Sequence, residues 1–282
     1  MNDYLKAVII GIVEGLTEFL PVSSTAHIRI TQHFLGIDSA DEYWKMFAVV
    51  IQLGAILTVV LYFWKRLKSF LGSFPKGATG KNKWWNHPLS LVVIAFAVTA
   101  IPSFYINDRI GKNLESMTII AWALIIGGVV MWVIDLFFAD KGRTTDIADM
   151  TFLQAMVIGA AQILSAAFPG TSRSMITTAA GQVMGMNRSA ALEFSFFLSI
   201  PVMFAATGLK LGQFVLKPKV SVTGEQWGVL AVGFVVSFAV ALVVVHLFIG
   251  WVKKRGFTPF AVYRVLVGSI MLWAIYQGTF PK

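Results

Sequence analysis

The chain has 282 residues, of which 57% are hydrophobic and only 13% are charged, and its mean hydropathy is +0.74. Soluble domains average about 25% charged residues, so the composition excludes an ordinary soluble fold and favours a helical membrane protein. The net charge of +9 comes mainly from residues between apolar runs, which indicates membrane topology rather than nucleic-acid binding. The absence of cysteine excludes disulfides and thiol chemistry.

Apolar segments recur along the chain, and six of them approach the roughly 20 residues that a bilayer crossing needs. These six cover 44–64, 89–106, 117–138, 190–209, 226–251 and 260–280. Three others are shorter or interrupted. Segment 5–20 contains two glutamates and stops at Pro21, segment 151–168 stops at Pro169, and segment 174–186 is only moderately apolar.

Basic residues between the apolar runs indicate which ends face the cytoplasm. Residues 65–87 and 252–258 are rich in Lys and Arg and are expected on the cytoplasmic side. Counting crossings from these loops makes 5–38 enter and leave on the outer side, and 151–186 on the inner side. The sequence therefore predicts an all-α integral membrane protein with six transmembrane helices, two re-entrant helical hairpins, and both termini outside.

The same count gives two halves of opposite orientation within one membrane domain, residues 1–282. Residues 1–138 form the first predicted inverted repeat and residues 151–282 the second. In membrane proteins built this way, broken helices meet near the midplane. Irregular backbone at that depth must be buried in protein or line a wet cavity. The two hairpin tips are therefore expected to face each other and form one site.

The first hairpin carries carboxylates, hydroxyls and a histidine. Glu14 and Glu18 are four residues apart and share a helix face, where a hard cation such as Mg²⁺ or Ca²⁺ would relieve their repulsion. A polar stripe facing a loop or arginine residues is the alternative. His27 follows three hydroxyl residues: Ser23, Ser24 and Thr25. Serine beside histidine fits a nucleophile with its base, or a histidine acting alone, but the hydroxyls could equally only cap the next helix.

The second hairpin carries an anion-binding pattern. Gly170 permits an unusual turn, and the N–H groups at the following helix start can cradle an anion. Arg173 adds a planar fork suited to phosphate. The hydroxyls around it are Thr171, Ser172, Ser174 and Thr177. A capped helix start with a snorkelling arginine is the alternative. Together the two hairpins indicate phosphoryl chemistry on an amphiphilic substrate with a phosphate head and a lipid tail.

Both segments match the signatures of a known family. One signature, Glu-Gly-x-Thr-Glu-Phe-x-Pro-x-Ser-Ser-Thr-x-His, is present from Glu14 to His27. The other, Pro-Gly-x-Ser-Arg-Ser-x-x-Thr, is present from Pro169 to Thr177. On these residues the chain resembles the bacitracin-resistance family of bacterial undecaprenyl-diphosphate phosphatases. The likeness extends over the whole chain, through residues 50–54, 193–196 and 259–264.

The resemblance implies hydrolysis of undecaprenyl diphosphate to undecaprenyl phosphate, which recycles the lipid carrier for cell-wall synthesis. It also implies a multi-pass protein of the bacterial inner membrane, with its site open to the outer face and a dependence on a divalent cation. A homodimer is a further possibility. By motif position, Glu14 and Glu18 would hold the cation, and the catalytic residues would be Ser24, His27, Glu18 and Arg173. Substrate binding would fall to Ser23, Thr25, Gly170, Thr171, Ser172, Ser174 and Thr177.

Two questions stay open from the sequence. The resemblance does not decide whether Ser24 or His27 attacks phosphorus, and a transporter or flippase for a phosphorylated lipid shares several of these features. Three residues also depart from the family pattern: Ala26 and Met175 stand where glycine is usual, and Ala48 stands where a glutamate is common. The first two raise the question of which backbone conformation these positions adopt, because glycine reaches positive φ cheaply.

Overall fold

A computed structural model describes residues 1–38, 40–75, 84–110, 116–138, 141–216 and 222–280. These residues fold into eleven α-helices and two short 3-10 helices, with one isolated bridge between Thr144 and Met186. The α-helices are α1 (Asp3–Thr17), α2 (Ser24–Phe34), α3 (Glu42–Tyr62), α4 (Trp64–Ser73), α5 (Pro88–Ile110), α6 (Met117–Phe138), α7 (Phe152–Ala167), α8 (Arg173–Val183), α9 (Arg188–Leu216), α10 (Gly224–Arg255) and α11 (Thr258–Tyr276).

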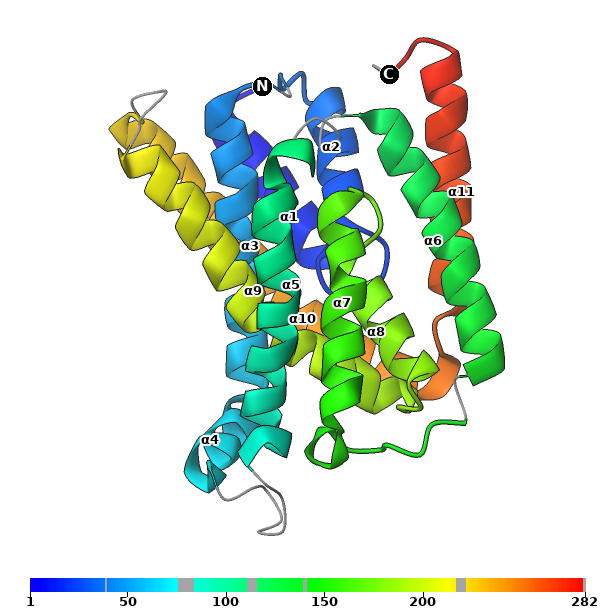
Figure 1. The fold of residues 1–282 in the computed structure, drawn as a ribbon. Coiled ribbons are helices and arrows are strands. Elements are labelled where there is room, and N and C mark those ends of the chain that lie inside the picture. Colours follow the sequence, from blue (N-terminus) through cyan, green and yellow to red (C-terminus); the bar gives the residue numbers. More distant parts are fainter. Residues whose placement is uncertain (39, 76–83, 111–115, 139–140, 217–221, 281–282) are drawn as a thin grey trace.

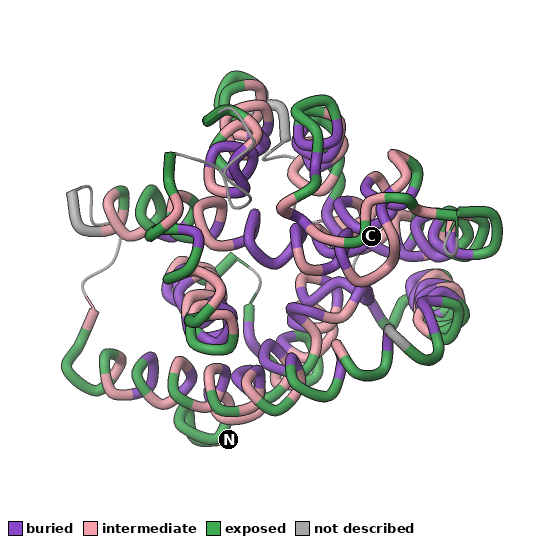
Figure 2. Tube along the Cα trace, turned by 90° about the horizontal axis from the view of Figure 1, so that it is seen from below, coloured by how far each residue is buried: buried purple, intermediate pink, exposed green. Residues whose placement is uncertain are grey.

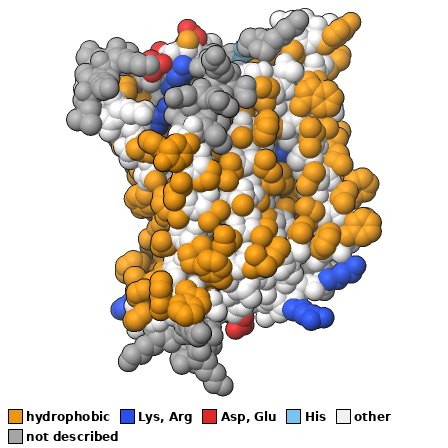
Figure 3. Space-filling model, in the orientation of Figure 1, with side chains coloured by type: hydrophobic (Ala, Val, Ile, Leu, Met, Phe, Trp, Pro, Cys, Tyr) orange, Lys and Arg blue, Asp and Glu red, His pale blue; other side chains and the backbone are white. Residues whose placement is uncertain are grey.

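Six of these helices are long and apolar enough to cross a membrane: α3, α5, α6, α9, α10 and α11. Figure 3 shows apolar side chains covering the middle of the visible face, while most of its charged side chains lie near the two ends. Seen along the long axis, buried residues mostly lie where helices face one another and exposed residues line the perimeter (Figure 2). This distribution confirms the predicted multi-pass, all-α membrane protein.

Four shorter helices form two pairs, and each pair is joined by a short loop. Residues 18–23 connect α1 to α2, and residues 168–172 connect α7 to α8. In the first pair, α1 packs mainly against α10, while in the second pair α7 packs against α5 and α8 against α6 and α9. The long helices therefore hold both loops inside the molecule (Figure 1).

Small residues let α1 approach α10 closely. A Cβ added at Gly11 would lie 2.8 Å from the Gly233 carbonyl oxygen, and one at Gly15 would lie 2.7 Å from the Ser237 oxygen. Glycines four residues apart on one helix face are typical of tight packing between membrane helices, where close contact replaces the hydrophobic effect. This packing fixes α1, and with it the glutamates on its C-terminal turn.

The predicted bounds of several loops proved partly wrong. Residues 65–73, placed in the loop 65–87, belong to α4 because their apolar side chains recur at helical spacing and Phe70 is buried. Helix α9 continues to Leu216 and α10 to Arg255, beyond the apolar runs on which their predicted ends were based. Lysines 76, 81 and 83 of the predicted loop 65–87, and lysines 217 and 219 of the predicted loop 210–225, lie outside the described residues.

Candidate active site

Each of the two loops ends in a serine whose backbone conformation is rare outside glycine. Ser23 has φ of 73° and Ser172 has φ of 70°. In the described part of the chain they are the two residues other than glycine with positive φ. Such a conformation costs of order 1–3 kcal/mol and persists only where the surroundings enforce it. Each serine caps the following helix, since its Oγ accepts the N–H of Ala26 or of Met175 at 3.4 Å.

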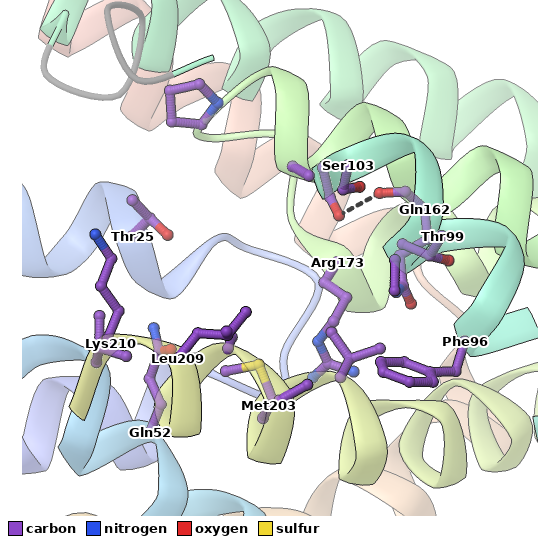
Figure 4. A pocket seen from close by; sticks show the side chains of 18 of the residues that line it. Thr25, Gln52, Phe96, Thr99, Ser103, Gln162, Arg173, Met203, Leu209 and Lys210 are labelled. Atoms are coloured by element: carbon purple, nitrogen blue, oxygen red, sulfur yellow. Dashed lines mark hydrogen bonds between the residues drawn. The ribbon is translucent and has the colours of Figure 1, made fainter. Parts of the chain in front are cut away.

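A cavity of about 790 Å³ lies where the two loops meet. The loops and the first turns of α2 and α8 supply part of its wall: Glu18, Ser23, Ser24, Thr25, Pro169, Gly170, Ser172 and Arg173. Helices α5 and α9 supply a largely apolar wall that includes Phe96, Ile101, Phe104, Val202, Met203 and Leu209. The volume is that of a small-molecule site. In Figure 4, Thr25, Gln52 and Lys210 gather on one side of the cavity and Thr99, Ser103 and Gln162 on the other.

Glu18 is the centre of the polar contacts in this cavity. Its Oε2 accepts a hydrogen bond from Ser24 Oγ at 2.6 Å, and its Oε1 accepts one from Arg173 Nη2 at 3.2 Å. The side chains of Glu18 and Arg173 are only 6% and 11% exposed, so the ion pair is largely removed from water. A serine hydroxyl that donates to a buried carboxylate is the arrangement of a nucleophile with its base.

Arg173 keeps donor capacity for a ligand. Its Nη1 donates to the Ser195 carbonyl oxygen at 3.3 Å, whereas its buried Nε has no hydrogen-bond partner. A guanidinium carries five N–H donors in a fixed fork, and a planar fork matches the oxygens of a phosphate. Arg173 also begins α8, where the helix N-terminus favours negative charge. Both features suit an anion in the cavity.

Other hydroxyls of the second motif make contacts within the protein instead of facing the cavity. Ser174 Oγ donates to the Leu20 carbonyl oxygen of the first loop at 3.1 Å. Thr177 Oγ1 donates to the Arg173 carbonyl oxygen at 2.8 Å and lies 2.6 Å from Ser195 Oγ. Neither residue lines the cavity, and Thr171 does not line it either. Of the seven residues predicted to bind substrate, the structure therefore places four at the cavity: Ser23, Thr25, Gly170 and Ser172.

His27 lies apart from Ser24. Its Nδ1 is 2.7 Å from the Ser23 carbonyl oxygen, and because a carbonyl can only accept, Nδ1 carries a proton. In the neutral ring, Nε2 then accepts the hydroxyl proton of Tyr263 at 2.7 Å. His27 does not line the cavity, and in the described residues Ser24 is bonded to Glu18 instead. The structure thus does not bring together the predicted pair of Ser24 and His27.

Glu14 is a fully buried carboxylate without a hydrogen-bond partner for either oxygen. It interacts electrostatically with Glu18 and Arg173 but does not line the cavity. An unsatisfied buried carboxylate is costly, and a hard cation would satisfy it. No group of three or more His, Asp or Glu side chains able to hold a metal occurs among the described residues. Any cation beside Glu14 and Glu18 would therefore need further oxygen ligands from substrate or water.

The two departures from glycine leave the helix starts intact. Ala26 lies in α2 and Met175 in α8, and neither has a positive φ. The left-handed conformation falls instead on the capping serines. Met175 is 2% exposed and belongs to a core cluster with Phe19 and Ala261.

Replacing Met175 by glycine is expected to lower the free energy of unfolding by about 3 kcal/mol or more. A large-to-small core substitution costs roughly 2–5 kcal/mol, and glycine in a helix adds about 1 kcal/mol. Thermal unfolding in detergent measures the change. Met156→Gly on α7 is the matched control, because Met156 is 38% exposed and should report the helix contribution alone. Equal losses in both variants would contradict the packing role.

Several cavity residues were missed by motif reasoning. Polar side chains from the surrounding helices line the cavity at Gln52, Thr99, Ser103, Gln162, Ser165, Lys210 and Gln213. Gln162 is 1% exposed, and neither atom of its amide has a partner. A polar side chain within an apolar segment was the signal available in the sequence for Gln52 and Gln162.

Comparison with known proteins shows the family to which the chain belongs. The chain matches the family model described as bacitracin resistance protein BacA over residues 7–270. It is 54% identical to the undecaprenyl-diphosphatase of Koribacter versatilis, with 98% of this chain and 99% of the relative covered. It is 43% identical to the undecaprenyl-diphosphatase of Caldanaerobacter subterraneus, with 98% of each covered, and 38% identical to that of Lacticaseibacillus paracasei, with 98% and 100% covered. The chain therefore belongs to the bacitracin resistance protein BacA family.

Proposed function

We propose that this chain hydrolyses undecaprenyl diphosphate to undecaprenyl phosphate and phosphate, the activity named for its relatives. One observation supports the proposal independently of the similarity to relatives. Ser24, Glu18 and Arg173 meet in a cavity between two loops of a multi-pass membrane protein. A nucleophile, a base and an anion-binding fork at one place are what transfer of a phosphoryl group needs.

The cavity suits an amphiphilic substrate. Arg173 and the starts of α2 and α8 would bind the diphosphate at the polar end. The lipid tail would lie along the apolar wall that α5 and α9 present, past Phe96, Phe104 and Val202. Water-exposed phosphate and buried polyprenyl chain are thereby separated within one site.

In the mechanism that the contacts support, Ser24 Oγ attacks the terminal phosphorus and gives its proton to Glu18. The bond from that phosphorus to the bridging oxygen breaks, and undecaprenyl phosphate departs with the proton that Glu18 took from Ser24. Arg173 stabilises the negative charge on the phosphoryl oxygens through donors that it does not use in the protein. Water, whose proton passes to Glu18, then attacks the phosphorus; the bond to Ser24 Oγ breaks, phosphate leaves, and Glu18 returns the proton to Ser24 Oγ. His27 was predicted to be catalytic, but it takes no direct part in this scheme because Tyr263 occupies its Nε2.

A divalent cation is the proposed cofactor, held by Glu14 and Glu18. Bound there, it would neutralise charge on the diphosphate as a Lewis acid. The unsatisfied oxygens of Glu14 fit this role.

Chelating divalent cations should reduce phosphate release by roughly 100-fold or more, since several kcal/mol of charge stabilisation is lost. Adding back Mg²⁺ or Ca²⁺ should restore the rate in the native protein. The isosteric variant Glu14→Gln should not regain the native rate at the same cation concentration. Full activity in excess chelator would contradict the proposed cation.

We further propose that the pairs α1–α2 and α7–α8 are re-entrant hairpins in inverted repeats. Helices α1 and α7 have 15 and 16 residues, which at 1.5 Å per residue is short of the roughly 30 Å hydrocarbon core. Each pair precedes three long apolar helices, α3, α5 and α6 in one half and α9, α10 and α11 in the other.

The proposed orientation places the protein in the bacterial inner membrane with its cavity open to the outer face. Both termini lie at one end of the molecule, opposite α4 (Figure 1). Helix α4 carries Lys65, Arg66 and Lys68, and basic residues favour the cytoplasm. The cavity reaches Tyr105 and Lys210 near the C-terminal ends of α5 and α9, toward the end with the termini.

Phosphate release from undecaprenyl diphosphate by the detergent-purified protein tests the function. The expected result is phosphate release in the presence of the native protein and none in its absence, with undecaprenyl phosphate as the lipid product. Binding of the lipid without phosphate release, by monodisperse protein supplied with Mg²⁺ or Ca²⁺, would overturn the proposal.

A further inference from the structure

Arg264 on α11 is a fully buried guanidinium that binds carbonyl oxygens of both loops. Its Nη1 donates to the Pro21 oxygen at 3.1 Å, and its Nη2 donates to the Gly170 oxygen at 3.0 Å. Each acceptor lies two residues before the positive-φ serine of its own loop, Ser23 or Ser172. The arginine thus contacts the two loops at equivalent positions.

The same side chain is anchored to α6. Nη2 also donates to the Ala123 oxygen at 3.0 Å, and Nε donates to the Leu124 oxygen at 3.3 Å. In the described residues no carboxylate pairs with it. A buried charge costs several kcal/mol unless hydrogen bonds compensate it. Here carbonyl dipoles are the compensation, and all of them must be in place at once.

The surrounding residues leave space for this arrangement. A Cβ added at Gly127 would overlap Arg264 Nη2 and lie 2.8 Å from Met175 Cε. One added at Gly170, where φ is 94°, would lie 2.6 Å from the Ile120 oxygen. Glycine at both positions therefore keeps α6, the second loop and the guanidinium in contact. These contacts hold the guanidinium of Arg264 in one defined position.

We propose that Arg264 is a positioning residue that fixes the loop preceding Ser24 relative to the loop preceding Arg173. This inference rests on the proposed hydrolysis, because it concerns the geometry of that reaction. Ser24 and Arg173 follow different loops, and Glu18 links them at the site by contacts to both. A misplacement of about 1 Å between reacting groups can cost roughly 100-fold in rate. Arg264 does not line the cavity and acts only through the loops.

The kinetic test uses three variants. Arg264→Lys keeps the charge but replaces the fork with a single ammonium, Arg264→Met fills similar volume without donors, and Gly127→Ala crowds the guanidinium without removing it. Each is expected to lower kcat by roughly 100-fold with a smaller change in KM, since the substrate contacts remain. Gly250→Ala on α10 is the control, because a Cβ there meets no atom within 4 Å.

A structural readout separates positioning from general stability. The chain has no cysteine, so a double variant, Leu16→Cys with Phe168→Cys, carries one spin label at each position. Both residues are exposed and lie at or near the two loops. We expect Arg264→Lys to shift or broaden the distance distribution between these labels relative to the native background, and Gly250→Ala to leave it unchanged.

The outcomes separate the two proposals. An unchanged label distance in Arg264→Lys and Gly127→Ala, or a kcat within threefold of native in both, would overturn the positioning role. Should one variant fail to fold, the other still decides. If the native protein releases no phosphate, the proposed hydrolysis fails, and the label distances alone then decide whether Arg264 holds the loops together.

Discussion

Replacing Ser24 by alanine should reduce phosphate release by roughly 1,000-fold or more, the scale seen when a serine nucleophile is removed. The hydroxyl lies in the cavity, 2.6 Å from Glu18 Oε2, and the variant removes the attacking oxygen while keeping the capping serine at Ser23. Single-turnover hydrolysis of undecaprenyl diphosphate measures the chemical step directly. Thermal unfolding should change by little, because α2 keeps its cap.

Ser199→Ala is the matched control for Ser24→Ala. Ser199 is a fully buried serine on α9 that bonds to its own helix at the Phe196 oxygen and does not line the cavity. Its replacement should leave the rate near that of the native protein. A Ser24→Ala protein with more than a tenth of the native rate would show that Ser24 is not the nucleophile, and direct activation of water by Glu18 would replace it.

Replacing Arg173 by alanine should lower kcat/KM by roughly 1,000-fold or more, comparable to loss of an arginine that stabilises a phosphoryl transition state. Two effects combine. The diphosphate loses its planar donor, and Glu18 loses the partner at 3.2 Å that holds its carboxylate in place beside Ser24. Steady-state kinetics over a range of substrate concentration separates the loss in binding from the loss in turnover.

Arg173→Lys discriminates between these effects. Lysine keeps a positive charge near Glu18 but presents a point charge instead of a fork, so its activity should lie between those of the native protein and Arg173→Ala. If lysine restores the native rate fully, charge alone is sufficient and the bidentate role of Arg173 is wrong. Native-like activity in Arg173→Ala would remove Arg173 from the site altogether.

The long helices could be predicted because hydropathy alone decides them: segment 117–138 and α6 coincide to the residue. Helix α4 could not be predicted from hydropathy, since its charged face masks the single buried Phe70. Its helical periodicity was the better signal. Predictions from mean hydropathy therefore fail for amphipathic elements at the membrane boundary.

Most residues of the candidate site could be predicted from the sequence, but the contacts between them could not. Spacing suggested Ser24 with His27, yet the positive φ at Ser23 starts α2 so that Ser24 faces Glu18 and His27 turns toward Tyr263. No local pattern reveals that conformation in a serine. Cavity residues such as Gln52 and Lys210 come from helices distant in the sequence, and only the packing of α3 and α9 brings them to the loops.

The position of Arg264 in the chain also bears on biosynthesis. All four of its acceptors, at Pro21, Ala123, Leu124 and Gly170, precede it and are made before α11 leaves the ribosome. An arginine at the centre of a lone membrane helix costs about 2.5–3.5 kcal/mol on insertion, and α11 has the lowest mean hydropathy of the six long helices, 1.5. Helix α11 should therefore enter the bilayer efficiently only beside the earlier helices, whose carbonyls receive its charge.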